Sequence, residues 1–243
     1  MLGDLNWGLK TKGDLNLVSK LFLTYKAVLA KQKLLKTNSK RFVFDERDFI
    51  LPDSFLVKTT LEFLHDTHKQ FIINHCLRTY LFGTIIGKSE SIKIDKELFL
   101  ISALLHDIGL TEKHQFIHRN CNCFAIEGAI EAGIFLEKQK FDKTKTLIVQ
   151  DAISLHLNIN LPSLLPEAYL LNKGAAVDVV GQELNNFSSE CISKVIETYP
   201  RLNFKTEFHT IMKKQCSERP KSRTAFLYNN GFGGLIKKAG FKE

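Results

Sequence analysis

The chain has 243 residues, of which 44% are hydrophobic and 10% aromatic. This composition is typical of one soluble globular domain with a sizeable core. The longest apolar runs, such as LFLISALL at residues 98–105, fall short of the ~20 residues that a membrane-spanning helix needs, and the N-terminus lacks the apolar core of a signal peptide. A cytoplasmic protein is therefore expected.

The net charge of +8 is unevenly distributed. Residues 1–40 contain eight lysines and two acids, residues 201–243 contain ten basic residues and three acids, and the middle of the chain is acidic. A basic N-terminal helix could contact anionic partners or a membrane surface, although dispersed lysines are more typical of a solvated face. Nucleic-acid binding is not expected, because no recognition module is visible.

Helical periodicity dominates the chain and predicts an all-α fold. One domain is expected at residues 50–243, preceded by a basic helical extension and connector at residues 1–49. Ser54 or Asp53 is a candidate helix cap, and Gly87 is expected to break a long helix. Helices are predicted near residues 16–37, 54–66, 69–87, 95–107, 124–139, 143–156, 166–180, 187–198 and 203–216, with a short one in the glycine-rich tail.

The five cysteines are odd in number and irregularly spaced, which argues against a disulfide framework. Cys121 and Cys123 form the one close pair. A C-x-C pair by itself is a weak metal signal, so two free thiols in a polar loop are expected.

Titratable residues occur inside apolar segments at three places. His106 and Asp107 end the hydrophobic segment ELFLISALL, and Gly109 follows as a candidate left-handed helix cap. His75 lies in FIINHCLRTYLFG, and Asp178 lies in NKGAAVDVVGQ. A buried imidazole or carboxylate costs free energy unless it has a partner, so either a metal ion or, for Asp178, an arginine is expected nearby.

Gly174 and Ala175 precede Asp178 by one helical turn. Residues this small would let another helix or an ion approach this part of the chain closely.

The spacing of these residues resembles the H…HD…D signature of the HD-domain metal-dependent hydrolases. The segments NHCLRTYLFG, ELFLISALLHDIGLT, FAIEGAIEAGIFL, VQDAISLHLN and RPKSRTAFLYNNGFG are similar to the branch that includes fungal cyanamide hydratase. The resemblance covers about residues 50–240. It implies a single-domain HD-type helical bundle in which His75, His106, Asp107 and Asp178 converge on one divalent metal, with positions left for water.

Other residues are weaker candidates for the site. His156 could bind a second metal, transfer a proton or satisfy a buried network, and the close pair His114 and His118 makes a single metal the favoured interpretation. Glu127 is a candidate general acid or base, together with Asp107 and His156; it shares a helix face with Glu131, so one of the two is expected to be protonated or held by a cation.

Arg78 and Lys113 are expected to bind an anionic substrate group. The metal could be zinc, iron, manganese or nickel.

These residues favour an enzyme in which a metal activates water. A phosphohydrolase acting on a nucleotide or another small phosphoester is the leading hypothesis, and hydration of a C≡N bond in a small nitrile is the alternative. An oxygenase would need two irons and further histidines. A non-catalytic binding module is the remaining possibility. A small-molecule substrate is expected in the catalytic cases, and a homo-oligomer is possible.

Overall fold

The computed structural model describes residues 1–34, 41–118 and 121–243, with side chains between residues 30 and 34 left out. Regular structure in these ranges is helical, apart from one antiparallel bridge between Asp14 and Ser222. The all-α prediction is therefore confirmed. The α-helices are α1 (Leu5–Thr11), α2 (Leu17–Leu34), α3 (Phe55–Thr67), α4 (Gln70–Ser89), α5 (Lys96–Leu105), α6 (Phe124–Lys138), α7 (Lys143–Leu155), α8 (Pro166–Val180), α9 (Ser189–Thr198), α10 (Phe204–Glu218), α11 (Arg223–Leu227) and α12 (Gly233–Lys238).

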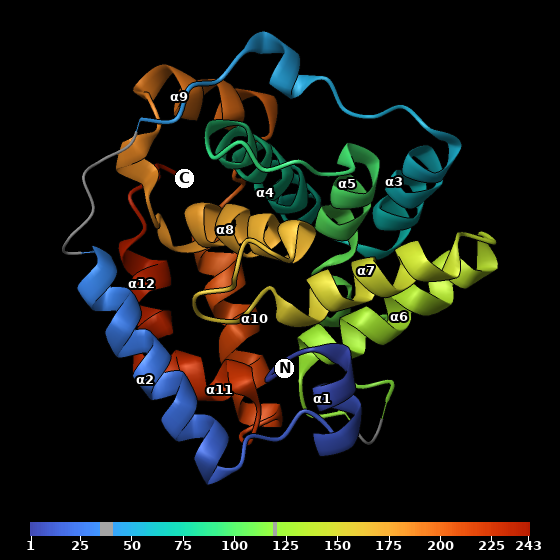
Figure 1. Ribbon diagram of the computed structural model, residues 1–243, viewed down its shortest axis with the longest axis vertical. Helices are drawn as coiled ribbons and strands as arrows, with labels where there is room; N and C mark the ends of the chain where they lie inside the picture. Colours follow the sequence, from blue (N-terminus) through green and yellow to red (C-terminus); the bar gives the residue numbers. More distant parts are fainter. Residues whose placement is uncertain (35–40, 119–120) are drawn as a thin grey trace.

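The helix α4 runs through the centre of the molecule (Figure 1) and is buried without interruption from Phe71 to Gly87. It crosses α8 at very short range. A Cβ atom on Gly174 of α8 would lie only 2.1 Å from the carbonyl oxygen of Thr79 on α4. The absence of a side chain at Gly174 therefore allows α4 and α8 to pack closely, and this contact places Asp178 next to α4. Gly87 does not break α4, which continues to Ser89.

The helix α5 ends at Leu105, with His106 as its C-cap, and a 3₁₀ turn follows at Ile108–Leu110. The prediction of a left-handed cap at Gly109 is wrong, because Gly109 is not among the residues with positive φ. A Cβ atom there would lie 2.2 Å from the carbonyl oxygen of Phe124 and 2.9 Å from the amide of Gly128. Glycine is required for the close approach of this turn to α6, rather than for its backbone conformation.

The first fifteen residues are held against the rest of the protein by hydrogen bonds and side-chain packing. The carbonyl of Leu2 accepts a hydrogen bond from Asn158, and Gly8 of α1 lies against Ile126 of α6. The helix α1 was not expected from the sequence, although Asp4 is an ordinary N-cap for it. A domain boundary near residue 49 stays a prediction.

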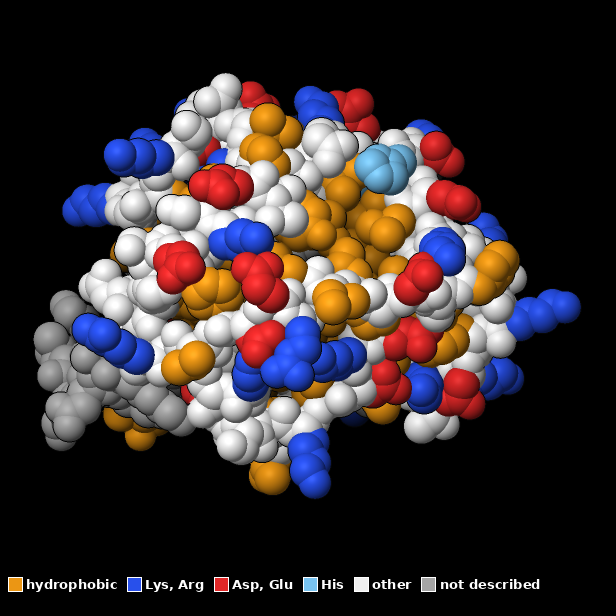
Figure 2. Space-filling model, turned by 90° about the horizontal axis from the view of Figure 1, so that it is seen from above, with side chains coloured by type: hydrophobic (Ala, Val, Ile, Leu, Met, Phe, Trp, Pro, Cys, Tyr) orange, Lys and Arg blue, Asp and Glu red, His pale blue; other side chains and the backbone are white. Residues whose placement is uncertain are grey.

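The helix predicted to start near residue 16 begins at Leu17, and its expected end at residue 37 lies outside the described residues. No helix among the described residues is both long enough and apolar enough to span a membrane. On the face shown in Figure 2, apolar side chains lie in a hollow that charged side chains surround.

Candidate metal centre

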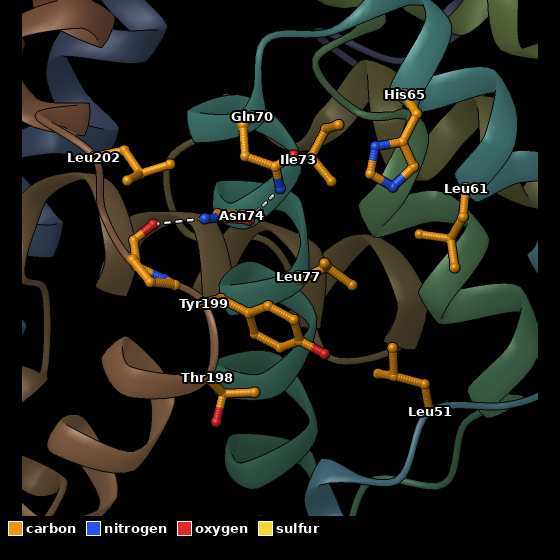
Figure 3. A pocket seen from close by; sticks show the side chains of 11 residues that line it. Leu51, Leu61, His65, Gln70, Ile73, Asn74, Leu77, Thr198, Tyr199 and Leu202 are labelled. Carbon is orange, nitrogen blue, oxygen red and sulfur yellow. Dashed lines mark hydrogen bonds between the residues drawn. The ribbon is translucent and has the colours of Figure 1, made fainter.

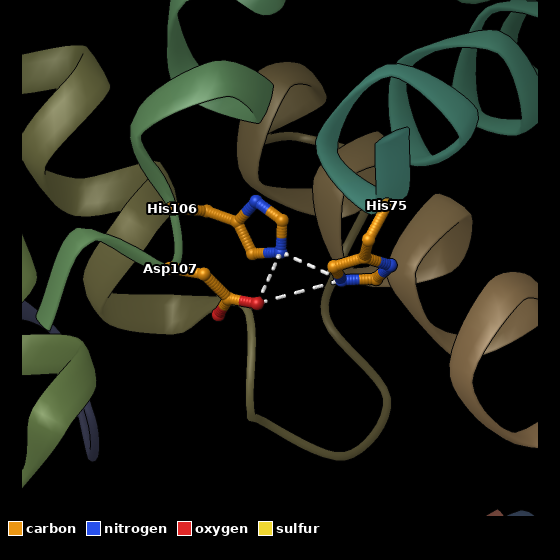
Figure 4. Close-up of side chains that lie close together, drawn as sticks. All are labelled: His75, His106 and Asp107. Carbon is orange, nitrogen blue, oxygen red and sulfur yellow. Dashed lines mark hydrogen bonds and ion pairs between the residues drawn. The ribbon is translucent and has the colours of Figure 1, made fainter. Parts of the chain in front are cut away.

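Three side chains from two helix segments meet in the core. His75 lies in the second turn of α4, whereas His106 and Asp107 directly follow the last residue of α5. Figure 4 shows their polar atoms facing one another. The two Nε2 atoms are 3.2 Å apart, and each lies 3.5 Å from Asp107 Oδ2. We call His75, His106 and Asp107 the core cluster.

Hydrogen bonds on the far side of both imidazoles orient them. His75 Nδ1 lies 2.7 Å from a carboxylate oxygen of Asp178, and His106 Nδ1 lies 2.7 Å from the carbonyl oxygen of Ala103. A carboxylate and a carbonyl can only accept, so each Nδ1 carries the proton and donates it. The Nε2 atoms therefore point into the core cluster, where in a neutral ring each would present a lone pair.

A carboxylate oxygen of the core cluster lacks a hydrogen-bond donor. Asp107 Oδ2 is buried without a hydrogen-bond partner, and the side chains of the cluster are at most 2% exposed. Burial also lowers the pKa of His106, which favours its neutral form. Two imidazole nitrogens and one carboxylate oxygen, all within 4.8 Å of one another, are the donor set of a divalent metal site. The residues present fit such an ion.

Asp178 contacts the core cluster through His75. Its carboxylate accepts the His75 hydrogen bond, two from Arg78 at 2.8 and 2.9 Å, and one from Arg201 at 2.8 Å. Burial alone would raise the pKa of Asp178, but Arg78, His75 and Arg201 hold it well below the usual range. In this arrangement Asp178 orients the imidazole of His75. Direct ligation of a metal by Asp178, as the resemblance implies, stays a prediction.

Arg201 was missed in the sequence. It follows Pro200 in a connector, outside any apolar helical segment, yet its side chain is 1% exposed. No periodic signal marks such a residue, because it becomes buried only when the connector folds over α8.

His156 lies beside the core cluster. Its Nδ1 donates to the carbonyl of Ile153 at 2.6 Å, so in the neutral ring Nε2 carries the lone pair. This Nε2 atom lies 3.9 Å from Asp107 Oδ1. Its ring contacts His106 edge to face, with centroids 5.1 Å apart. Burial, together with the neighbouring His106, lowers the pKa of His156 well below its ordinary value. The structure thus places a neutral proton acceptor at the edge of the core cluster.

Glu127 has a different set of partners. Its carboxylate accepts hydrogen bonds from the backbone amides of Phe116 and His118, both at 3.0 Å, and from the buried side chain of Arg219. Glu127 is therefore the carboxylate held by a cation, and its hydrogen bonds run to the loop and to Arg219 rather than to the core cluster. These bonds hold the loop that follows the 3₁₀ turn; a catalytic role for Glu127 stays a prediction.

The residues proposed to hold an anionic substrate also have protein partners. Arg78 is fully buried and, besides Asp178, donates to the carbonyls of Tyr199 and Pro200. Lys113 is exposed and donates to the carbonyl of Asp66 at 2.8 Å. Substrate binding by either residue stays a prediction.

Aromatic rings close one side of the core cluster. His75 stacks on Phe204 with centroids 4.6 Å apart, and Phe208 lies beside both rings. A further arginine, Arg223, lies close enough to His156 to affect its pKa, and it donates to Asn158 and to the carbonyl of Ser154. The core cluster thus has stacked aromatic rings on one side, whereas the arginines near Asp178 and His156 are bound to protein acceptors.

A surface cavity of about 590 Å³ is lined in part by side chains of α4 (Figure 3). Its wall includes Asn74, which donates to the carbonyl of Pro200, the same oxygen that accepts from Arg78. None of its lining residues belongs to the core cluster. The cavity is thus adjacent to the hydrogen bonds around Asp178 but does not open onto the proposed metal ligands.

Cys121 and Cys123 are free thiols, as expected, but both are buried rather than in an exposed polar loop. His118 pairs with Glu131 at 2.7 Å, and His114 Nε2 lies 3.9 Å from the same carboxylate. These histidines are therefore engaged away from the core cluster.

Comparisons with known proteins agree with this geometry. The family model described as HD domain matches residues 72–174. Two curated relatives in Saccharomyces cerevisiae, Cyanamide hydratase DDI2 and Cyanamide hydratase DDI3, are each 23% identical over 164 residues, which cover 64% of this chain and 70% of theirs. The resemblance drawn from the H…HD…D spacing is thus confirmed, because residues 72–174 match the HD-domain family model and the two relatives belong to the expected branch.

Proposed function

We propose that this HD-domain protein uses a divalent metal, held by His75, His106 and Asp107, to add water to the C≡N bond of a small uncharged nitrile. Cyanamide, the substrate in the names of the two yeast relatives, is the compound of choice for the test. The product would be a urea-type amide, formed without a leaving group.

The observation that supports a nitrile over a phosphoester is the set of cations around the core cluster. A phosphate group needs several cationic side chains to bind it. The arginines that lie near the core cluster, Arg78, Arg201 and Arg223, are all bound to protein acceptors within the part of the chain described. A small uncharged substrate needs no such groups and suits the stacked rings of Phe204 and Phe208.

One transition metal ion, zinc, iron, manganese or nickel, would be compatible with two nitrogen ligands and one oxygen ligand. When bound, it would act as a Lewis acid that makes water a better nucleophile near neutral pH. Asp178 and the carbonyl of Ala103 keep the two imidazoles in the tautomer that can bind such an ion.

His156 is the side chain proposed to move the proton. Its Nε2 would accept a proton from the attacking water while the water oxygen bonds to the nitrile carbon, and would return that proton to the nitrile nitrogen. The bond of Nδ1 to the carbonyl of Ile153 keeps Nε2 free for this task. Phe204, stacked on His75, would limit the access of other water molecules.

The proposal is tested by measuring the metal content of the purified protein and assaying it with cyanamide, nucleotides and a generic phosphoester. We expect urea production, no phosphatase activity, and about one equivalent of metal. His106→Ala should remove both the metal and the activity. His65→Ala, a change at an exposed histidine outside the core cluster, is the matched control and should affect neither.

Two results would overturn the proposal. Phosphate release that depends on His106, without turnover of cyanamide, would restore the phosphohydrolase hypothesis. A protein that binds no metal and has the same melting temperature after His106→Ala would exclude a metal enzyme.

A further inference from the structure

The helix α2 exposes apolar side chains along one face. Between Leu17 and Leu29 only Leu23 is buried, at 2% exposure. Six large apolar residues are 45% to 74% exposed, and we call them the α2 stripe: Leu17, Val18, Leu21, Phe22, Tyr25 and Val28.

The α2 stripe is continuous. With about 100° of rotation per residue, its six positions fall within an arc of roughly 140°, and the buried Leu23 lies on the other side of the helix. Figure 1 shows α2 at the outer edge of the molecule, so one side of the helix faces outward. An apolar face of this width is what a helix normally buries, and its exposure marks an interaction surface.

The body of the protein holds α2 in this position. Leu15 N donates to the carbonyl of Lys221, Asp14 forms an antiparallel bridge with Ser222, and Asn16 caps the first turn by accepting from the amide of Ser19. These contacts hold the first residues of α2 in place. Leu23 then faces the body of the protein, and the α2 stripe faces outward.

The charges on α2 indicate what covers the stripe. The segment from residue 17 to residue 34 has four lysines and no acid, and no acid occurs between Asp14 and Asp45. Lys20 and Lys26 lie on opposite flanks of the α2 stripe, and Lys26 Nζ is 5.6 Å from the centre of the Phe22 ring. Pairing with α2 of a second copy would bring two wholly cationic helices together, whereas an anionic lipid surface complements the lysines on both flanks.

We infer that α2 docks onto anionic phospholipid membranes, with the α2 stripe in the interface and the flanking lysines among the lipid headgroups. The helix would lie in the plane of the membrane surface. This inference is independent of the chemistry at the core cluster.

The test uses the full-length protein and vesicles of phosphatidylcholine, with or without phosphatidylglycerol, in a co-sedimentation assay. We expect binding to the anionic vesicles to be about tenfold or more tighter than to the neutral ones, and to weaken as salt is raised. Leu21→Ser combined with Phe22→Ser should lower binding about tenfold or more.

The matched control is Phe55→Ser combined with Leu164→Ser, because these residues are 80% and 89% exposed outside α2. It should bind as the unaltered protein does, and both double variants should keep the circular dichroism spectrum and melting temperature. Lys20→Gln with Lys26→Gln should reduce both the binding to anionic vesicles and its salt dependence.

Three outcomes would overturn the inference. The unaltered protein could remain in the supernatant with anionic vesicles, or both serine variants could bind equally well. Light scattering could instead show a dimer that Leu21→Ser with Phe22→Ser dissociates, which would assign the α2 stripe to a second copy of the chain.

Discussion

Replacing Asp178 by Asn tests whether the buried carboxylate acts through His75. Asp178 accepts bonds from His75, Arg78 and Arg201, and its side chain is fully buried. Asparagine keeps the size but removes the charge. Arg78 therefore loses the carboxylate with which it pairs, whereas Arg201 still pairs with Glu243 at 3.0 Å. Leaving a buried charge unpaired costs about 3 to 5 kcal/mol, and we expect that loss in the free energy of unfolding.

The same change should also weaken metal binding. If Asp178 only orients His75, the affinity for the metal should fall about 10- to 100-fold, which is typical for the loss of a group that supports a ligand histidine. Urea denaturation of the chelator-treated protein measures the first effect, and competition with a metal indicator measures the second. Separate measurements keep the loss of metal from being counted as a loss of intrinsic stability.

Glu243→Gln is the control for this experiment. It removes a partly exposed partner of Arg201 and should cost less than about 1 kcal/mol. A stability change below about 1 kcal/mol for Asp178→Asn, with unaltered metal affinity, would refute the reasoning. A loss of metal as complete as that in His106→Ala would instead make Asp178 a direct ligand.

Three further changes probe the packing around the site. Gly174→Ala should destabilise the protein by about 1 to 3 kcal/mol in urea denaturation because α4 and α8 must separate, whereas Gly234→Ala, with nothing within 4 Å, should not. Glu127→Gln should lower the free energy of unfolding by about 3 to 5 kcal/mol, because the buried charge of Arg219 loses its partner, and should leave metal affinity unchanged. Loss of the metal in this variant would give Glu127 a role at the site. Burial lowers the pKa of His68 to about 3. Below pH ~6.5 the unfolded chain binds a proton at His68 that the folded protein does not bind until about pH 3. The free energy of unfolding should therefore fall by ~1.4 kcal/mol per pH unit between about pH 6.5 and 3, more steeply than in His68→Gln; equal slopes would exclude this cause.

The sequence was sufficient for the main helices of this protein. The bounds predicted for residues 166–180 coincide with α8, and Ser54 was identified as a candidate cap for α3, because periodicity, proline and capping residues act within one or two helical turns. The helix α1 escaped prediction because seven residues carry too little periodic pattern. The cost of burying a titratable residue predicted that His75, His106 and Asp107 have partners, and the family resemblance implied that these residues meet.

Only the tertiary structure decided which partner each group has. Gly109 and Arg78 are clear cases. Gly109 allows a close contact with α6 rather than a left-handed cap, and the guanidinium of Arg78 is bound to Asp178. The connector that carries Arg201 completes that arrangement from 23 residues beyond Asp178. Hydrogen bonds and close packing depend on distances of a few tenths of an ångström between segments far apart in the chain, and residue type and spacing do not contain those distances.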